Sequence, residues 1–303
     1  MEPPRGFSVE EFETRTAAVQ AEMAEAEIDA LLLTTEPEVR YFSGFLSQFW
    51  ESPTRPWFLV VPAAGKPIAV VPEIGAAGFV ATWLDDIRTW PAPRPEDDGI
   101  SLLAELLKPC RRLGVQLGHE SHLRMPMGDF ANLGEQITQT EITDATDILR
   151  RQMVVKSDAE IAKIRHACQI ASEGFIALPD KATMGDSERD VCRKLRLDII
   201  ARGADSVPYM VAGSGPGGYD NIIMGPTDRV PDPGDILIID TGARYDGYFC
   251  DFDRNFAFGT PTDAARRAHA AVWQATEAGF AAARPGVTTS ELCAVMWTVL
   301  EEA

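Results

Sequence analysis

Residues 234–256 restrict the fold more than any other part of the chain. An apolar run ends at Asp240, an Asp-Gly dipeptide at 246–247 is typical of a two-residue hairpin turn, and an aromatic-rich run returns. With such a turn, Asp240 lies opposite Asp253. Because side chains alternate between the two faces of a sheet, Asp240, Asp251 and Asp253 are predicted to share one face.

Carboxylates crowded on one face repel each other unless a cation lies among them. Asp240 follows a fully apolar run, so we expect it to be buried or nearly so, and Gly242 opposite Asp251 would leave room for an ion. The alternative is that Asp253 pairs with Arg254 or another arginine at the surface while Asp240 only caps a turn. The shared face and the expected burial favour a divalent metal.

Composition limits the classes of partner. The chain has 303 residues, and 28 Lys and Arg against 46 Asp and Glu give a net charge of −18. This balance argues against nucleic acid or an anionic membrane as the main partner. No apolar run reaches the ~18 residues of a membrane span. Five cysteines without a CxxC pair, and an N-terminus without an apolar signal core, predict free thiols and a cytoplasmic protein.

The pattern of helices and strands changes near residue 155, which predicts an α/β domain over 1–154 and an α+β domain over 155–303. Two sequences typical of capping boxes, Ser8 with Glu11 and Ser157 with Glu160, begin predicted helices. In the first domain, helices are predicted at about 9–26, 74–84 and 101–108, and strands at 30–33, 57–61, 68–71, near 87 and at 114–117. In the second, helices are predicted at about 158–176, 187–202, 262–283 and from 289 onward, around a β-rich stretch at 208–258.

Three motifs resemble the M24 metallopeptidase family, which has the pita-bread fold of methionine aminopeptidase, prolidase, Xaa-Pro aminopeptidase and creatinase. The hairpin carries Asp240-x-Gly242 and then Gly247-Tyr248-x-x-Asp251-x-x-Arg254-x-Phe256. The segment 39–45, VRYFSGF, is similar to the signature of the creatinase-type N-terminal domain. The segment 156–165, KSDAEIAKIR, is similar to the start of the pita-bread domain.

The resemblance implies a creatinase-type N-terminal domain over 1–154, followed by a pita-bread domain over 155–303 that is incomplete. It implies that Asp240 chelates one metal ion and that Asp251 bridges two. The ions would be manganese or cobalt, with zinc or iron as alternatives. The remaining ligands, a His and two Glu, and the general acid/base would lie beyond Ala303. We therefore expect a C-terminally truncated chain that is inactive alone.

The activity implied is hydrolysis of an amide or peptide C–N bond by metal-activated water, as in Xaa-Pro peptidases, on a small peptide or amide-like substrate in a homodimer. One departure weakens this expectation: the segment before the first Asp strand has no His, and Ile223 stands near its usual position. The alternatives are a non-peptidase member that acts on a small osmolyte-like substrate as a hydrolase or lyase, or an inactive binding module. Retained Asp240 and Asp251 argue against the module and against a metal-free creatinase mechanism.

Four further residues are candidates near the site. Asp253 stands where the family usually has Thr; it would orient a metal ligand or bind a cationic substrate group, unless it is a surface residue paired with Arg254 or Arg229. Arg254 belongs to the same motif and is likewise a candidate to orient a metal ligand or to contact the substrate. In two-domain relatives an N-terminal loop reaches a partner's active site, so Trp50 and Arg55 are candidates to close that pocket, Arg55 by gripping a carboxylate. The alternatives are core packing for Trp50 and a surface salt bridge for Arg55.

Overall fold

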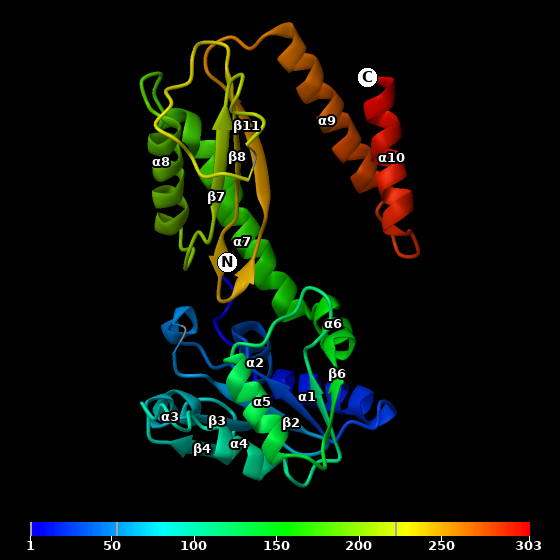
Figure 1. Cartoon of the computed structure of the whole chain (residues 1–303). Helices are drawn as coiled ribbons and strands as arrows, with labels where there is room; N and C mark the ends of the chain where they lie inside the picture. The colour runs from blue at the N-terminus through cyan, green and yellow to red at the C-terminus, as the bar shows by residue number, and fades with distance from the viewer. Residues whose placement is uncertain (1, 53, 222) are drawn as a thin grey trace. The chain divides into compact units, whose positions relative to one another are not determined.

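The computed structural model describes residues 2–52, 54–221 and 223–303. The chain divides into two compact units, Met1–Ile161 and Ala162–Ala303, and helix α7 (Asp158–Ala177) contains the division (Figure 1). The domain boundary at 154/155 that the sequence suggests stays a prediction. Each unit is described by itself below.

The first unit is built on a mixed six-stranded sheet in the order β4-β3-β2-β1-β5-β6 (Figure 1). Strands β1, β2 and β3 pair antiparallel, whereas the pairs β1–β5, β5–β6 and β3–β4 are parallel. Alternate residues of β1 enter two separate cores, because Leu31 and Leu33 face one layer while Ala30 and Leu32 face the other. The strands are β1 (Ala30–Leu33), β2 (Phe58–Pro62), β3 (Ile68–Pro72), β4 (Ile87–Trp90), β5 (Arg112–Val115) and β6 (Glu141–Asp144).

The helices of the first unit cover this sheet on both faces, as expected for an α/β unit. Ser8 begins the first helix as predicted, because its hydroxyl accepts a hydrogen bond from the Glu11 N–H. Three helices and one edge strand, α2, α5, α6 and β6, were not among the predicted elements. The helices are α1 (Val9–Glu25), α2 (Glu36–Ser43), α3 (Glu73–Val80), α4 (Ile100–Leu107), α5 (Met127–Gln136) and α6 (Thr146–Val154), with a 3₁₀ turn at Gln48–Glu51.

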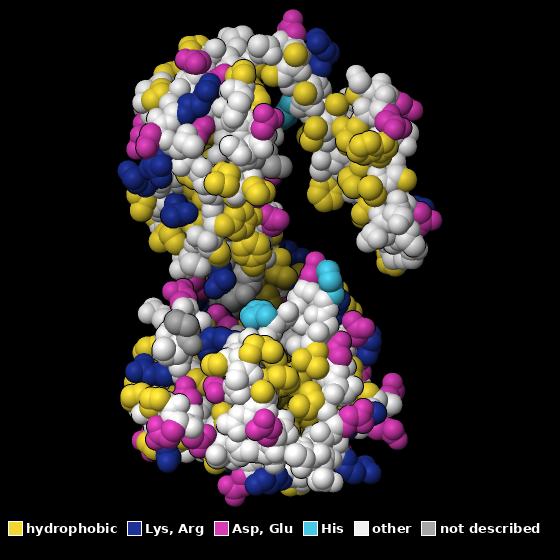
Figure 2. Space-filling model, viewed as in Figure 1, with side chains coloured by type: hydrophobic (Ala, Val, Ile, Leu, Met, Phe, Trp, Pro, Cys, Tyr) yellow, Lys and Arg dark blue, Asp and Glu magenta, His cyan; other side chains and the backbone are white. Residues whose placement is uncertain are grey.

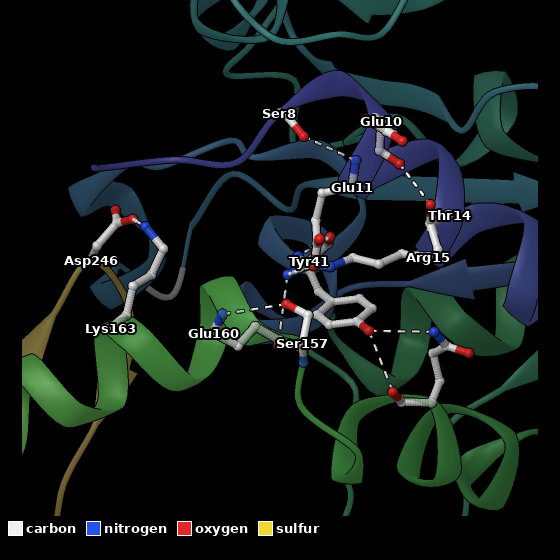
Figure 3. A network of polar contacts seen from close by, with 11 residues as sticks. Ser8, Glu10, Glu11, Thr14, Arg15, Tyr41, Ser157, Glu160, Lys163 and Asp246 are labelled. Atoms are coloured by element: carbon white, nitrogen blue, oxygen red, sulfur yellow. Dashed lines mark hydrogen bonds and ion pairs between the residues drawn. The ribbon is translucent and has the colours of Figure 1, made fainter. Parts of the chain in front are cut away.

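A buried arginine joins three elements of the first unit (Figure 3). The Arg15 guanidinium lies 3.0 Å from Glu11 Oε1 and 3.7 Å from Glu160 Oε1, and it donates to the Tyr41 carbonyl at 3.0 Å. Ser157 and Glu160 form the predicted capping box, with Ser157 N–H donating to Glu160 Oε2 and Glu160 N–H to Ser157 Oγ. The start of α7 is therefore held to α1 and α2.

The second unit contains a three-stranded antiparallel sheet in the order β11-β8-β7. Helices α7 and α8 (Glu188–Ala201) cover one face, where their apolar residues and those of β8 form one core. A short ribbon of β9 (Arg244–Tyr245) and β10 (Tyr248–Phe249) extends the hairpin. The long strands are β7 (Met210–Ser214), β8 (Ile236–Thr241) and β11 (Phe252–Ala257). This is the α+β architecture expected for the second half of the chain.

Helices α9 (Asp263–Ala282) and α10 (Thr289–Glu302) form a hairpin of their own (Figure 1). They approach closely at Gly279, where an added Cβ would lie 2.8 Å from the Met296 sulfur. Large apolar side chains remain exposed over both helices, including Trp273, Phe280 and Trp297 (Figure 2). Within the described parts of the chain, no helix is long and apolar enough to span a bilayer.

Candidate active site

The carboxylate hairpin has the register predicted from its turn. Tyr245 pairs with Tyr248, and Asp240 pairs with Asp253 across β8 and β11. The turn residue Asp246 adopts the left-handed conformation with φ of 48°, as a two-residue turn requires. The buried Lys163 ammonium of α7 lies 2.6 Å from its carboxylate (Figure 3). A helix of the same unit therefore holds the tip of the hairpin.

The space expected at Gly242 is filled by the chain itself. A Cβ at this position would lie 1.9 Å from the Cys250 carbonyl oxygen and 2.7 Å from the Phe249 ring. The prediction that Gly242 leaves room for an ion is therefore wrong. Its glycine is needed because the returning strand approaches the backbone closely.

Asp240 is half-buried, whereas near-complete burial was predicted, and Asp251 and Asp253 are exposed. Burial alternates along β8: Leu237, Ile239 and Thr241 are buried against the helices, and the residues between them are only half-buried. Strand β8 is therefore buried on one face only, although its residues before Asp240 are all apolar. Its carboxylate lies on the face that the two helices leave open.

Tyr209 brings two of the predicted residues together, and sequence reasoning missed it. Its hydroxyl lies 2.9 Å from Asp240 Oδ1 and also contacts Asp251 Oδ1. Burial raises the pKa of the Tyr209 phenol, and the hydrogen bonds to Asp251 and Asp240 raise it further. A phenol has one proton, so it can donate to only one of the two carboxylates at a time.

Asp240 and Asp253 line a cavity of about 170 Å³ on the open face of the sheet. Although Asp253 is exposed, partial desolvation of its carboxylate by neighbouring atoms raises its pKa, and the nearby Asp240 carboxylate adds to this effect. Gly218 and Tyr219, from the connection between β7 and β8, form part of the wall. A larger groove of about 1000 Å³ lies beside it, between the same sheet and α9.

The oxygen donors of the hairpin fit a metal ion only in part. Two carboxylates that share one phenol proton are hard oxygen donors with uncompensated charge, which suits a divalent cation. Within residues 2–52, 54–221 and 223–303, however, no three His, Cys, Asp or Glu side chains are grouped so that they could hold a metal. Asp240 and Asp251 thus fit as part of a ligand set, and Asp253 does not complete it.

The arginines considered as partners of Asp253 are directed elsewhere. Arg254 donates to the Asp253 carbonyl oxygen at 2.7 Å and lies over the Phe252 ring at 4.8 Å. Arg229 binds the Asp235 carboxylate at 2.7 Å. A role for Arg254 toward substrate or a metal ligand stays a prediction.

Trp50 and Arg55 belong to the first unit. Trp50 is 8% exposed and packs against Phe45 and Trp57, which agrees with the core packing named as one alternative, while its role in closing a partner's pocket stays a prediction. Arg55 is half-buried, with its guanidinium 5.4 Å from the centre of the Phe49 ring. Its proposed reach into a partner's pocket stays a prediction.

Arg124 determines the shape of the loop that carries both residues. Its guanidinium donates to main-chain carbonyl oxygens along the loop, and it also lies 5.1 Å from the centre of the Trp50 ring. Burial lowers the pKa of Arg124. The acceptors are the carbonyls of Phe49, Trp50, Ser52, Thr54 and Arg55.

Two family models match the chain, one in each half: "Creatinase/Prolidase N-terminal domain" over residues 15–154 and "Metallopeptidase family M24" over residues 162–303. The chain is 29% identical over 311 residues to a probable dipeptidase PepE of Mycobacterium tuberculosis, covering 99% of this chain and 78% of that protein. It is 25% identical over 281 residues to an Xaa-Pro dipeptidase of Pyrococcus horikoshii, covering 91% and 73%.

Solved structures agree with these matches. The dipeptidase PepE from Mycobacterium ulcerans superposes with a TM-score of 0.82 at 28% identity, covering 98% of this chain and 78% of that one. The prolidase from Pyrococcus horikoshii has a TM-score of 0.79 at 23% identity, covering 95% and 78%, which shows the shared fold. With a creatinase-type first unit and the carboxylate hairpin in the second, the chain belongs to the M24 metallopeptidase family.

Proposed function

We propose that this chain contributes Asp240 and Asp251 to the dinuclear metal centre of a peptide hydrolase similar to Xaa-Pro dipeptidases. The observation that carries the proposal is the convergence of the two carboxylates on the Tyr209 hydroxyl. Dipeptidases and an Xaa-Pro dipeptidase among its relatives support a small peptide as the substrate. The peptide bond would be cleaved by hydrolysis, with water as the second reactant.

The residues present would act by holding and orienting. Asp240 of β8 and Asp251, which directly precedes β11, would hold the cations, and Tyr209 would fix the orientation of the carboxylate to which it donates. A bound pair of divalent ions would supply a hydroxide near neutral pH and polarise the scissile carbonyl. Oxygen donors fit manganese, and cobalt, zinc and iron are the alternatives to be compared.

The described residues provide only part of the ligand set, so we expect these 303 residues alone to bind metal weakly and to lack turnover. A homodimer, in which Arg55 of one protomer approaches its partner's pocket, is part of the same proposal. Both points are testable on the chain itself by metal titration and by its mass in solution.

The experiment is an Asp251→Asn substitution. Calorimetric titration with Mn²⁺ should show an affinity reduced by at least about tenfold, because one anionic ligand has become neutral, while circular dichroism stays unchanged. In any form of the protein that hydrolyses proline dipeptides, the same variant should abolish metal-dependent turnover. Asp147→Asn is the control, since Asp147 is an exposed carboxylate of the first unit, with 80% of its side chain exposed. Unchanged metal binding and turnover in Asp251→Asn would end the proposal.

A second candidate function is chemistry on a small osmolyte-like substrate, by hydrolysis or elimination. Ile223, at the position where the resemblance implies a His, is 83% exposed, so an apolar group replaces a polar donor there. The added Asp253 carboxylate in the cavity suits a cationic substrate group. A panel of proline dipeptides, betaine-like compounds and cyclic amidines separates the two, since rapid dipeptide cleavage would exclude this candidate. An inactive binding module would show neither turnover nor metal binding.

A further inference from the structure

A buried carboxylate outside the metal candidates holds the loop that walls the acidic cavity. Glu188, the first residue of α8, is 2% exposed. Its Oε1 accepts from the Ser214 hydroxyl at 2.6 Å. Its Oε2 accepts from the Thr227 hydroxyl at 2.7 Å and from the Thr227 N–H at 2.9 Å. Burial alone would raise the pKa of Glu188, but these hydrogen bonds outweigh it and lower the pKa.

The two partners of Glu188 stand at opposite ends of one loop. Ser214 is the last residue of β7, and Thr227 follows the loop 215–226, of which the structure describes all but residue 222. Two main-chain hydrogen bonds strengthen the second end, from Glu188 N–H to the Arg229 carbonyl at 2.8 Å and from Arg189 N–H to the Thr227 carbonyl at 3.0 Å. One carboxylate thus fixes both ends of the loop to the start of a helix.

Glycines allow the loop to lie flat against β7. A Cβ at Gly213 would lie 2.6 Å from the Gly218 carbonyl oxygen, and a Cβ at Gly218 would lie 2.2 Å from the Ser214 carbonyl oxygen. Further along, the Met224 carbonyl accepts from the Ala212 N–H at 3.2 Å. The loop therefore returns along the strand edge instead of extending into solvent.

The loop forms one wall of the cavity that Asp240 and Asp253 line. Gly218 and Tyr219 contribute to that wall, and the Tyr219 hydroxyl accepts from the Ile236 N–H at 3.0 Å. The loop also presents Ile223 and Met224, which are 83% and 56% exposed. A shift of the loop would change the shape of the cavity, while the pairing of β8 with β11 stays intact.

We propose that Glu188 is a positioning residue that clamps both ends of loop 215–226 and so sets the substrate-side wall of the acidic cavity. It is not one of the candidate metal ligands and acts through Ser214 and Thr227. The effect on the loop stands on its own geometry, whereas the effect on substrate binding rests on the proposed function.

Hydrogen–deuterium exchange on the whole chain tests the clamp directly. Glu188→Gln keeps the size of the side chain but removes its charge and one acceptor, so amides in 215–227 should exchange roughly 10- to 100-fold faster. Exchange in α7 and β8 should stay unchanged. Glu277→Gln, which alters an exposed carboxylate on α9, is the matched control and should leave exchange unchanged both in the loop and in α7 and β8. Unchanged exchange in the loop, or equal acceleration throughout the second unit, would overturn the proposal.

Two milder variants keep the test decisive if Glu188→Gln does not fold. Thr227→Val should accelerate exchange mainly at 224–227, and Ser214→Ala mainly at the start of the loop. If neither variant changes exchange in the loop, the clamp does not exist.

Kinetic and metal-binding measurements distinguish an effect of Glu188 on the substrate-side wall of the cavity from an effect on metal binding. In a form of the protein that hydrolyses proline dipeptides, Glu188→Gln should raise the KM for a proline dipeptide more than it lowers kcat. It should leave the Mn²⁺ affinity of the chain unchanged, because the hairpin that carries Asp240 and Asp251 is untouched. A loss of Mn²⁺ affinity, or a fall in kcat at constant KM, would overturn the assignment to the substrate wall. If the wild-type chain binds no Mn²⁺, the proposed function fails, while the exchange data still decide whether Glu188 clamps the loop.

Discussion

Asp240 and Asp253 lie directly opposite each other in the ladder between β8 and β11. Like charges in directly opposed positions destabilise a sheet. Partial desolvation raises the pKa of Asp253, and the Asp240 carboxylate raises it further, as expected for repulsion between two like charges. The pair therefore costs stability unless a proton or a cation lies near it.

Replacement of one member should stabilise the metal-free chain. We expect Asp253→Asn to raise the free energy of unfolding at pH 7 by roughly 0.2–1 kcal/mol, measured by urea titration. A carboxyl group with a raised pKa destabilises the fold once it ionises, so the gain should be present at neutral pH and vanish in acid. Asp235→Asn is the opposite control, because it removes the partner of Arg229 and should lower stability. A variant that is less stable than wild type at pH 7 would contradict the repulsion.

The Tyr209 hydroxyl should matter to both carboxylates that it contacts. Tyr209→Phe removes the donor but keeps the ring. We therefore expect the Mn²⁺ affinity to fall by roughly 10- to 100-fold, the typical effect of removing a hydrogen bond to a metal ligand. Calorimetric titration measures it. Tyr41→Phe, which removes a hydroxyl from the first unit, should bind Mn²⁺ as wild type does. Equal affinity in both variants would mean that Tyr209 does not orient the ligands.

The buried pair of Lys163 and Asp246 should be strongly coupled. Lys163→Met leaves the Asp246 carboxylate buried without its ammonium, which should cost about 3–5 kcal/mol of unfolding free energy. Adding Asp246→Asn removes that charge and keeps a residue that tolerates a positive φ, so the double variant should recover part of the loss. Chemical denaturation of both single variants and the double variant gives the coupling. Additive losses would show that the pair is not a unit.

The Glu188 carboxylate should make stability depend on pH in the acid range. Its pKa is lowered in the folded state from the ordinary value of 4.5. Its contribution is therefore complete above pH 4.5 and is lost as the pH falls through the lower folded-state pKa. Glu188→Gln should be less stable than wild type near pH 6, and the difference should shrink in acid. Thermal denaturation over pH 3–6, near the pKa of a carboxyl group, measures this; a constant difference across the range would contradict it.

The register of the hairpin was predictable because it is local: once the Asp-Gly turn is assigned, every cross-strand pair follows by counting. Tyr209 was not, since it meets Asp240 only through the pairing of β7 with β8, and nothing in the residues around position 209 specifies that partner. The burial of Asp240 was overestimated because an unbroken apolar run does not reveal which face of the sheet is covered.

Helix α2 shows the same limit in the first unit. Its eight residues include Pro37 and several aromatic or β-branched residues, which have low helix propensity. Val39 and Phe42 are fully buried in the core, so packing stabilises a helix that local preference does not. The segment was recognisable as a family motif, but its conformation was not predictable from periodicity.

All the hydrogen bonds described between the Arg124 guanidinium and the loop around Trp50 and Arg55 go to main-chain oxygens. Every residue type supplies the same carbonyl group, so the outward-facing positions of that loop can be exchanged without loosening the grip. The outward-facing side chains of the loop are therefore free to change during evolution, while Arg124 keeps the backbone of the loop in the same conformation.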